Sequence, residues 1–379
     1  GQSKTESFGA LDGAQRTFEK KFYEKTMNTW SLRDDFVKHS GKYHLMLMDY
    51  GDDEGESTSA KMAKLKAEIP DSKLPPRVAS VVEMISDTAM MGNALKELEI
   101  DTKKMPLGKV QKKQIRQALE VIAKIAEEVG SKCRGSVLSD LSSQFYTIIP
   151  HDTGFSVPPV INSLDTVKKK MELLDTLADL EIAAKLLDHA ALKKENPLDS
   201  TYKMLNTALT PMPKGSPLWD TLCTYVTQTH GPTHKAYQLE VLDILEVARE
   251  GEDARFTTHI GHRKLLWHGS RLSNVIGILS QGLRIAPPEA PTTGYMFGKG
   301  VYFADIVTKS ANYCHTSPSS NVGLLLLCDV ALGSVYPLLK AKYMDKPPSG
   351  THSTMGLGKW QPDPALDKTL KSSEASPSL

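Results

Sequence analysis

The sequence has 379 residues, which is enough for two or three domains, and its hydrophobic fraction of 40% is enough to build real cores. The 46 Lys and Arg residues nearly balance the 45 Asp and Glu residues, so no global basic field indicates nucleic acid, and any DNA contact must come from a local patch. No signal peptide is visible, and the longest apolar run, at residues 324–327, is far too short to span a membrane.

The four cysteines are scattered through the chain and form no CxxC pair. This pattern is typical of reduced thiols in an intracellular protein, rather than of a disulfide framework or a zinc site. His230 and His234 have a spacing found in metal sites, but Pro232 lies between them and no cysteine is near. We therefore expect no metal.

Residues 1–50 are predicted to form a small α/β unit. Residues 16–30 have the period of an amphipathic helix. The apolar side of this helix carries three aromatic residues, Phe18, Phe22 and Trp30. Residues 41–50 then alternate between apolar and polar, as a half-buried strand does. Composition alone favours an ordinary solvated helix with a hairpin.

Residues 51–71 contain acidic, Ser and Lys residues without an apolar period, as a linker does. The next segment, residues 72–190, has a helical period and is predicted to be an α-helical bundle. One apolar stripe recurs at helical spacing: Val110, Ile115, Leu119, Ile122, Ala126 and Val129. Such stripes usually form the core of a bundle.

A long helix is predicted to begin after Ser163, whose hydroxyl can cap it. Its apolar positions are Val167, Met171, Leu174, Leu177 and Leu187. Glu172, Asp175 and Asp179 are three and four residues apart, which puts them on one face of this helix. From the sequence alone this face is either a solvated acidic surface or a functional one.

Residues 195–370 show the pattern of short strands. Four strands are predicted, over residues 237–249, 265–267, 301–303 and 324–330. The last of these is expected to be fully buried, because it is continuously apolar. Residues 371–379 contain Ser and Pro without any period and are predicted to be a tail.

The densest set of candidate functional residues lies between residues 265 and 313. A short apolar run ends abruptly in His268-Gly269-Ser270, and glycine-rich loops follow it. Glycines let the backbone come close to a ligand, and polar residues at strand tips can reach it. We therefore expect a cleft between strand ends.

The residue types in this cleft suit a nicotinamide nucleotide. Four rings offer flat faces on which a planar ring can stack: Tyr295, Tyr302, Phe303 and Tyr313. The backbone of Gly269 and the hydroxyl of Ser310 suit an amide, and His268 can reach a sugar hydroxyl. An aromatic amide attached to a sugar is found in NAD. The alternative is a β-rich domain with glycine turns.

The glycine pattern argues against hydride transfer. Gly298-Lys299-Gly300 is followed by Val-Tyr-Phe, a strand pattern, rather than by a third glycine that opens a helix. The dinucleotide fingerprint of the Rossmann fold is therefore absent.

Several consecutive motifs resemble, in the same order, the poly(ADP-ribose) polymerases, and in particular their DNA-dependent branch. The motifs are His268-Gly269-Ser270 and the segments 282–291, 294–300 and 302–305. The likeness extends over nearly the whole chain and is strongest to the second member of that branch, with the third next.

The resemblance implies a multidomain α+β fold. Its parts are a partial WGR α/β unit at 1–50, a linker at 51–71, an α-helical regulatory domain at 72–190, an incomplete mixed or antiparallel β-rich ADP-ribosyltransferase domain at 195–370 and a tail at 371–379. WGR domains of this family sense DNA breaks, but the Trp-Gly-Arg tripeptide itself does not occur in this chain.

The activity that the resemblance implies is NAD-dependent protein ADP-ribosylation, with elongation of poly(ADP-ribose) in the DNA-break response. The expected substrate is NAD, used without a metal, and the expected acceptors are proteins, including the enzyme itself. Broken DNA would be bound through the complete WGR domain of the parent protein. The expected location is nuclear, with no membrane partner. The glycosidic bond to nicotinamide would break through an oxocarbenium-like state, as in glycosidases.

The resemblance also implies roles for the site residues. Gly269 and Ser310 would bind the carboxamide, and Tyr302 and Tyr313 would enclose the nicotinamide ring. The remaining cleft residues are His268 at the adenine-side ribose 2′-hydroxyl, Ser270 and Arg284 on the adenosine side, Tyr295 and Phe303 as further stacking faces, and Lys309 beside the reacting centre. The catalytic candidates are His268, Tyr302 and Lys309. The acidic face formed by Glu172, Asp175 and Asp179 would look toward the cleft and be autoinhibitory.

The resemblance also implies that the chain is shortened at both ends, and besides the Trp-Gly-Arg tripeptide a second feature of the family is expected to be missing. The family's catalytic glutamate belongs to a strand beyond the segment matching residues 356–359, and the only glutamate after Glu289 is Glu374, in a Ser-rich stretch. We therefore expect this chain to be nearly inactive in polymer synthesis and prone to aggregation.

Three alternatives stay open. The first is a catalytically silent protein that binds NAD, DNA or a partner, and the second is a mono-ADP-ribosyltransferase. The third is a hydrolase that uses His268, Ser270 and Asp305. It is the weakest, because two of its residues are nearly adjacent and no G-x-S-x-G elbow is present.

Overall fold

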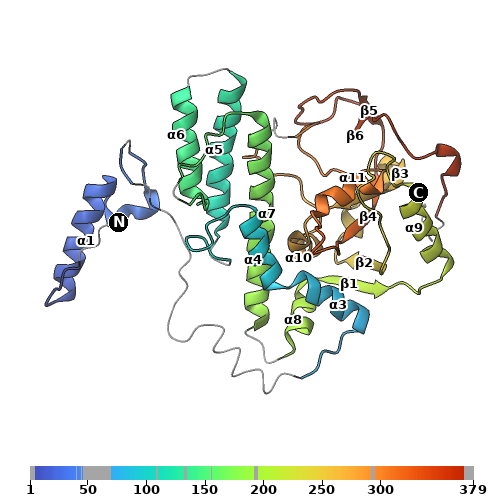
Figure 1. Ribbon diagram of the computed structural model, residues 1–379, viewed down its shortest axis with the longest axis horizontal. Coiled ribbons are helices and arrows are strands. Elements are labelled where there is room, and N and C mark those ends of the chain that lie inside the picture. The colour runs from blue at the N-terminus through green and yellow to red at the C-terminus, as the bar shows by residue number, and fades with distance from the viewer. Residues whose placement is uncertain are drawn as a thin grey trace. The chain divides into compact units, whose positions relative to one another are not determined.

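The structure is a computed structural model, and the chain forms two compact units, Gly1–Asp49 and Tyr50–Leu379 (Figure 1). It describes residues 5–39, 41–43, 45, 70–107, 110–131, 135–154, 156–191, 195–291 and 295–370. Most of the predicted linker, the tail with Glu374, and residues 46–50 of the predicted N-terminal strand lie outside these residues.

The N-terminal unit contains the helix α1 (Leu11–Thr26) and the 3-10 helix η1 (Trp30–Asp35). The predicted helix was wrong at both ends. It ends early because Met27 adopts a left-handed conformation, with φ of 59°, and its N–H bonds the carbonyl of Tyr23. Trp30 folds back instead, and its ring meets the rings of Phe18 and Phe22 edge-on at centroid distances of 4.9 and 5.1 Å.

The second unit begins with the predicted helical bundle. Its helices are α3 (Pro76–Ile85), α4 (Thr88–Glu97), α5 (Lys112–Gly130), α6 (Gly135–Ile148), α7 (Leu164–Ala191) and α8 (Pro197–Met204). The apolar stripe predicted for α5 is confirmed, because all its members are buried except Val129, which is partly buried. The cap predicted for α7 is also confirmed, since the hydroxyl of Ser163 accepts the N–H of Thr166 at 3.2 Å.

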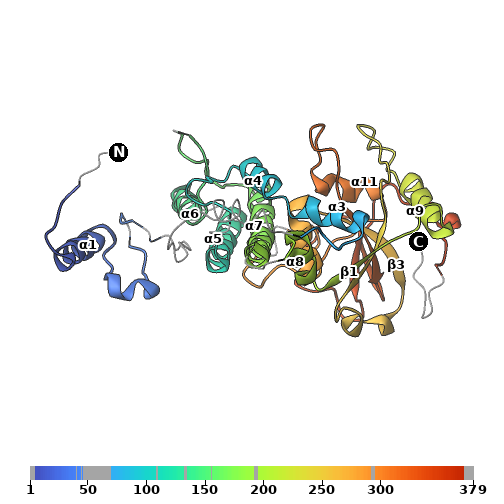
Figure 2. The same cartoon turned by 90° about the horizontal axis from the view of Figure 1, so that it is seen from below.

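Helix α7 lies between the other long helices and the strand-rich region (Figures 1 and 2). It packs against α5 on one side and against α10 (Val275–Gln281) and η4 (Leu272–Asn274) on the other. Its buried apolar residues therefore point in several directions; they include Leu173, Leu174, Leu177, Leu180 and Ala183. This position is why one face of α7 meets the candidate site.

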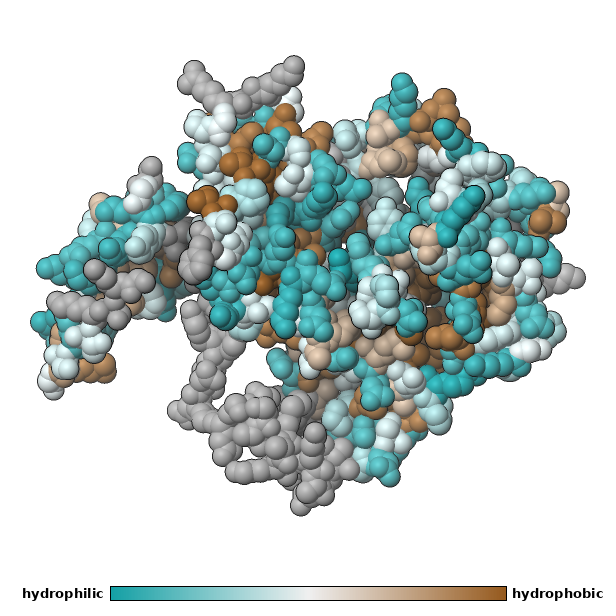
Figure 3. Space-filling model, in the orientation of Figure 1, coloured by the Kyte–Doolittle hydropathy of each residue, from teal (hydrophilic) through white to brown (hydrophobic). Residues whose placement is uncertain are grey.

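The strand-rich region follows α8. Its strands are β1 (Thr207–Pro211), β2 (Leu245–Arg249), β3 (Arg263–Gly269), β4 (Leu325–Ala331), β5 (Val335–Leu338) and β6 (Ser353–Gly356), and its other helices are α9 (Pro217–Gln228) and α11 (Val307–Ala311). Among the described residues β1–β2 and β3–β4 pair antiparallel and β5–β6 pair parallel. The α+β fold class is thus confirmed. The face in Figure 3 is covered mainly by hydrophilic side chains, with apolar ones in scattered groups.

Two of the four predicted strands differ from the structure. The strand expected over residues 237–249 is formed only as β2, because its partner β1 ends at Pro211 and Pro213 follows soon after, and proline has no N–H for the ladder. Residues 301–303 form no strand. Next to them, Ala304 exchanges two backbone hydrogen bonds with Trp267, at 2.8 and 2.9 Å, and pairing goes no further.

The strands β3 and β4 confirm the other two predictions, with one correction. β4 is half-buried along its whole length, not fully buried. Within the described residues it has a hydrogen-bonded neighbour, β3, on one edge only. The pairing sets His268 opposite Leu326 and Gly269 opposite Leu325, so the polar trio stands at the end of β3.

Candidate active site

The end of β3 is pressed against α11. A β-carbon on Gly269 would lie 1.9 Å from the carbonyl oxygen of Ser310, so only glycine fits there. The hydroxyl of Ser310, which is 4% exposed, donates to the carbonyl of Trp267 at 2.8 Å. The structure therefore brings together Gly269 and Ser310, which are far apart in the sequence.

His268 is held by the segment that follows the glycine loops. Its Nδ1 lies 2.8 Å from the carbonyl oxygen of Tyr302, which assigns the proton to Nδ1 and leaves Nε2 as an acceptor. Burial lowers the pKa of His268, and the hydrogen bond opposes that shift only in part. The ring of Phe303 lies edge-on to His268, at a centroid distance of 5.8 Å. A neutral imidazole with one available acceptor nitrogen results.

The ring of Tyr302 is fixed at its hydroxyl end. Its hydroxyl donates to the carbonyl of Gly298 at 2.6 Å and accepts the N–H of Phe297 at 3.1 Å. Gly298 itself has φ of 91° and touches the backbone of Met344, so no other residue fits there. The ring of Tyr295 stacks beside Tyr302, with centroids 6.3 Å apart and an angle of 22°.

Two tyrosine rings keep open faces. Tyr302 is 40% exposed, and Tyr313, in the 3-10 helix that follows α11, is 48% exposed. Lys309 is exposed on α11, one residue before Ser310. Open aromatic faces beside a buried hydroxyl are what a planar amide needs.

Asn274 is a site residue that sequence reasoning missed. Its side-chain amide donates to the hydroxyl of Ser270 at 3.0 Å and fixes that side chain directly after the end of β3. The only local signal for this pair in the sequence is that two polar residues, Ser270 and Asn274, are four positions apart and precede an apolar helix. Cys314 was expected from the sequence only to be one of four reduced thiols. In the structure it is 8% exposed and lies beside Gly269. Burial raises the pKa of its thiol to about 11.

The acidic face of α7 lies beside the predicted adenosine-side residue. A carboxylate oxygen of Asp179 accepts from the guanidinium of Arg284 at 2.6 Å. Burial raises the pKa of Asp179 to about 6, with Arg284 acting in the opposite direction. Glu172, two turns away, is exposed.

Asp175 lies between those two carboxylates. Surrounding protein raises its pKa to about 7, and repulsion from Asp179 and Glu172 adds to the effect. Asp175 is nevertheless an exposed residue. The hydroxyl of Tyr295 is buried and has no hydrogen-bond partner among the described residues, and burial and the charge of Asp175 raise its pKa. The face therefore adjoins the aromatic wall of the site.

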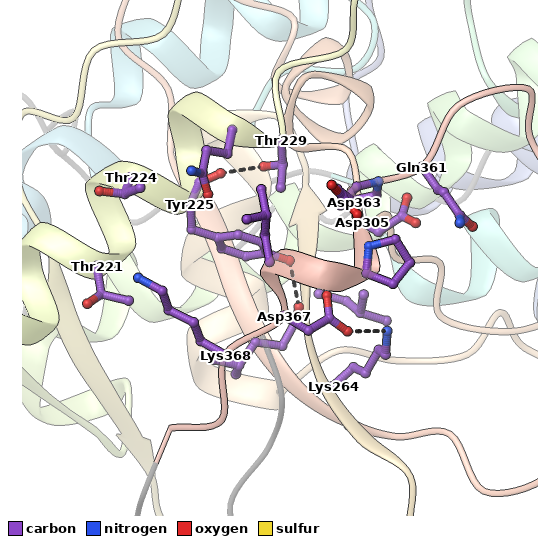
Figure 4. Close-up of a pocket in the computed structure, with 16 residues that line it drawn as sticks. Thr221, Thr224, Tyr225, Thr229, Lys264, Asp305, Gln361, Asp363, Asp367 and Lys368 are labelled. Carbon is purple, nitrogen blue, oxygen red and sulfur yellow. Dashed lines mark hydrogen bonds and ion pairs between the residues drawn. The ribbon is translucent and has the colours of Figure 1, made fainter.

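A pocket of about 250 Å³ lies elsewhere, between α9, the start of β3 and the segment around residues 361–368 (Figure 4). Tyr225 donates there to the carbonyl of Leu265 at 3.0 Å, and Lys264 lies 3.6 Å from Asp367. Asp305 lines this pocket, whereas His268 and Ser270 have the partners described above. The residues of the hydrolase alternative are thus not joined, and the end of β3 beside α11 is the better candidate site.

The two histidines with a spacing found in metal sites form other contacts. His234 Nδ1 lies 2.7 Å from the hydroxyl of Thr308, and His230 Nε2 lies 2.8 Å from the carbonyl of His234. Within the part of the chain that the structure describes, no three His, Cys, Asp or Glu side chains form a group able to hold a metal ion. None of the described helices is both long and apolar enough to cross a membrane.

Comparison with known proteins supplies the class of each part of the chain. Residues 219–377 match the catalytic domain of poly(ADP-ribose) polymerase, residues 72–202 match the regulatory domain of the same enzymes, and residues 1–37 match the WGR domain. The order of the three matches is the one expected from the sequence motifs.

Relatives match over almost the whole chain. It is 43% identical to poly [ADP-ribose] polymerase 2 of Homo sapiens, over 96% of this chain and 63% of that protein. It is 43% identical to poly [ADP-ribose] polymerase 1 of Xenopus laevis, over 98% of this chain and 37% of that protein. It is 43% identical to poly [ADP-ribose] polymerase 2-A of Oryza sativa subsp. japonica, over 97% of this chain and 56% of that protein.

The chain belongs to the poly(ADP-ribose) polymerase family. The expected likeness to the second member is consistent with these matches, although identity to the first type is the same. The chain spans about a third to two thirds of the length of these relatives.

Proposed function

We propose that this chain carries the NAD site of a protein ADP-ribosyltransferase that makes poly(ADP-ribose). The observation that supports it most is the close contact of Gly269 with Ser310, beside the open rings of Tyr302 and Tyr313. A carboxamide bonded at Gly269 and Ser310 would place the attached aromatic ring between the two tyrosines. The residues present therefore fit a nicotinamide.

In the proposed reaction the bond between the ribose C1′ and the nicotinamide nitrogen breaks, and neutral nicotinamide leaves with the bonding electron pair. The acceptor oxygen forms a new bond to C1′ and loses its proton. The transition state resembles an oxocarbenium ion. No metal is needed in this scheme, because the leaving group is already a cationic pyridinium.

The chain's own residues would bind and orient the substrate. His268 would accept a ribose hydroxyl at Nε2, since Nδ1 is occupied by Tyr302. Ser270, which Asn274 holds in place, and Arg284 would line the adenosine side. Phe303 and Tyr295 would fix the walls of the cleft, and Lys309 would lie beside the reacting centre. Binding in a defined orientation lowers the barrier by removing motional freedom in advance.

Label transfer tests the proposal. The chain is incubated with NAD that carries a label on its adenosine, and protein-bound label is measured by denaturing electrophoresis. Label on protein supports transfer, whereas tight binding of NAD without label supports the silent-protein alternative. Product length separates polymer from single ADP-ribose units.

Partners and location are proposed from the family. The WGR match supports binding of broken DNA through that domain, and the names of the relatives support polymer synthesis on proteins. Nuclear location in the DNA-break response follows from the same argument. A gel-shift assay with nicked DNA checks the first of these.

The acidic face of α7 supports autoinhibition. Glu172, Asp175 and Asp179 present carboxylates next to Arg284 and Tyr295, where they would repel the pyrophosphate of NAD. Deleting residues 74–188, inside the proposed regulatory domain at 72–190, should raise NAD affinity and remove any dependence on DNA. Continued dependence on broken DNA would overturn this role.

A further inference from the structure

One loop of the catalytic region, residues 283–291, is held to the helical bundle by two ion pairs of opposite polarity. Near its start, the guanidinium of Arg284 lies 2.6 Å from a carboxylate oxygen of Asp179 on α7. Near its end, the carboxylate of Glu289 lies 3.1 Å from the guanidinium of Arg116 on α5. We call this loop the strap.

The strap is fixed at its ends and mostly exposed between them, except that Ala286 is partly buried against the core of the bundle. It begins after Gly282, which has φ of 77°, and a β-carbon on Gly282 would lie 3.0 Å from the guanidinium of Arg249. It ends near Ala290, which is 3% exposed and belongs to the core of the bundle. Ile285, in contrast, is 62% exposed. Such a span moves only if its side-chain contacts are broken.

The middle of the strap contacts the segment before Tyr302. The ammonium of Lys299 donates to the carbonyls of Pro287 and Pro288, at 3.2 and 2.8 Å. Lys299 follows Gly298, whose carbonyl accepts the hydroxyl of Tyr302. The strap therefore connects the bundle to the wall of the cleft.

We propose that Arg116 and Glu289 form a clip that holds the strap on the bundle and so keeps Arg284 paired with Asp179. The inference rests on the proposed function, in which Arg284 lines the adenosine side of NAD. While the clip is closed, a phosphate of NAD competes with the carboxylate of Asp179 for the same guanidinium. Arg116 and Glu289 are thus positioning residues that act through Arg284.

The clip shifts an equilibrium between two positions of the strap. Because its ion pair exists only when the strap lies on the bundle, breaking it favours the position in which Arg284 is released. Arg116 is 58% exposed and Glu289 is 26% exposed, so the pair resembles exposed ion pairs, which change an equilibrium by about two- to fivefold. High salt weakens such a pair.

The test uses the whole chain and four variants. Arg116→Gln and Glu289→Gln each break the clip, and the exchange Arg116→Glu with Glu289→Arg restores it with reversed polarity. Lys169→Gln breaks a more exposed ion pair on α7, with Asp165, which does not include a residue of the strap. NAD affinity is measured by titration calorimetry at low and high salt, and hydrogen exchange is measured for the strap amides.

Both Gln variants should bind NAD about two- to fivefold more tightly at low salt, with faster exchange in the strap. The charge exchange and Lys169→Gln should match the parent chain, and high salt should remove the differences. Unchanged strap exchange in both Gln variants would overturn the clip, as would weaker NAD binding by them. Binding of neither NAD nor a benzamide-type ligand by the parent chain would instead overturn the proposed function, while the exchange data still decide on the clip.

Discussion

The carbonyl oxygen of Ser310 lies 1.9 Å from the point where a β-carbon on Gly269 would stand. A strand end and a helix thus meet without space for a methyl group. Because both partners are backbone, neither can yield by changing a rotamer.

Gly269→Ala should therefore separate β3 from α11 and widen the carboxamide site. We expect about a 5- to 150-fold loss of affinity for a benzamide-type ligand, which corresponds to overpacking costs of about 1–3 kcal/mol. Titration calorimetry measures it. Gly300→Ala is the matched control, since a β-carbon there meets no atom within 4 Å. Equal affinities in the two variants would contradict the close contact.

The second prediction concerns the ring of Tyr313. Tyr313→Ala should weaken binding of a benzamide-type ligand by about 1–3 kcal/mol, because a stacking face is lost. Tyr313→Phe keeps the ring and should bind as the parent chain does. A similar loss in both variants would show that the hydroxyl, not the ring, contacts the ligand.

His268→Ala should weaken NAD by about 1–3 kcal/mol, because a buried hydrogen-bond partner is removed. A benzamide-type ligand lacks the ribose and should keep its affinity. Calorimetry with both ligands separates the two effects. Loss of benzamide binding as well would mean that His268 mainly supports Tyr302 through the 2.8 Å hydrogen bond.

The sequence predicted the helical bundle well because its signals are local. The stripe on α5 and the Ser163 cap each depend on residues within a few turns of one another. The extent of β2 was less predictable, because β2 begins at Leu245, opposite Pro211 at the end of its partner β1. The two residues are distant in the sequence, so no local pattern around β2 shows where the pairing stops. Residues Asp179 and Arg284 are 105 positions apart, so only the resemblance to a known family put α7 near the cleft. Asn274 was missed, since asparagine before a helix usually serves as a cap.

His151 is expected to make the free energy of unfolding of the chain depend on pH. It is 7% exposed, its Nδ1 bonds the carbonyl of Ile149 at 2.7 Å, and its Nε2 lies 2.8 Å from the ammonium of Lys170. Burial, followed by the charge of Lys170, lowers its pKa from 6.5 to about 4. Between those values the unfolded chain binds more protons, so stability falls as pH falls, by about 3 kcal/mol at most.

Urea unfolding at pH 6.5 and 4.5 measures this loss. In His151→Gln the amide keeps hydrogen-bonding capacity without titrating, so the stability difference between the two pH values should shrink. An unchanged difference would show that other groups dominate acid unfolding.

Asp175 and Asp179 give stability the opposite pH dependence from His151, because they lower stability as pH rises. The sign of this dependence can be tested. Their pKa values are raised from 3.8 to about 7 and about 6, so the folded chain binds more protons than the unfolded chain in that range. The stability they contribute is complete below about pH 4 and is lost as pH rises through 6 to 7. Because Asp175 reaches solvent, we expect an effect of only about 1 kcal/mol after screening. Asp175→Asn should therefore unfold at a higher urea concentration than the parent chain at pH 8, and the difference should be smaller at pH 5 and close to zero below about pH 4. Asp165→Asn, on the solvent side of α7, serves as the control. A variant less stable than the parent at pH 8 would mean that the Asp175 carboxylate has a favourable partner in the folded chain.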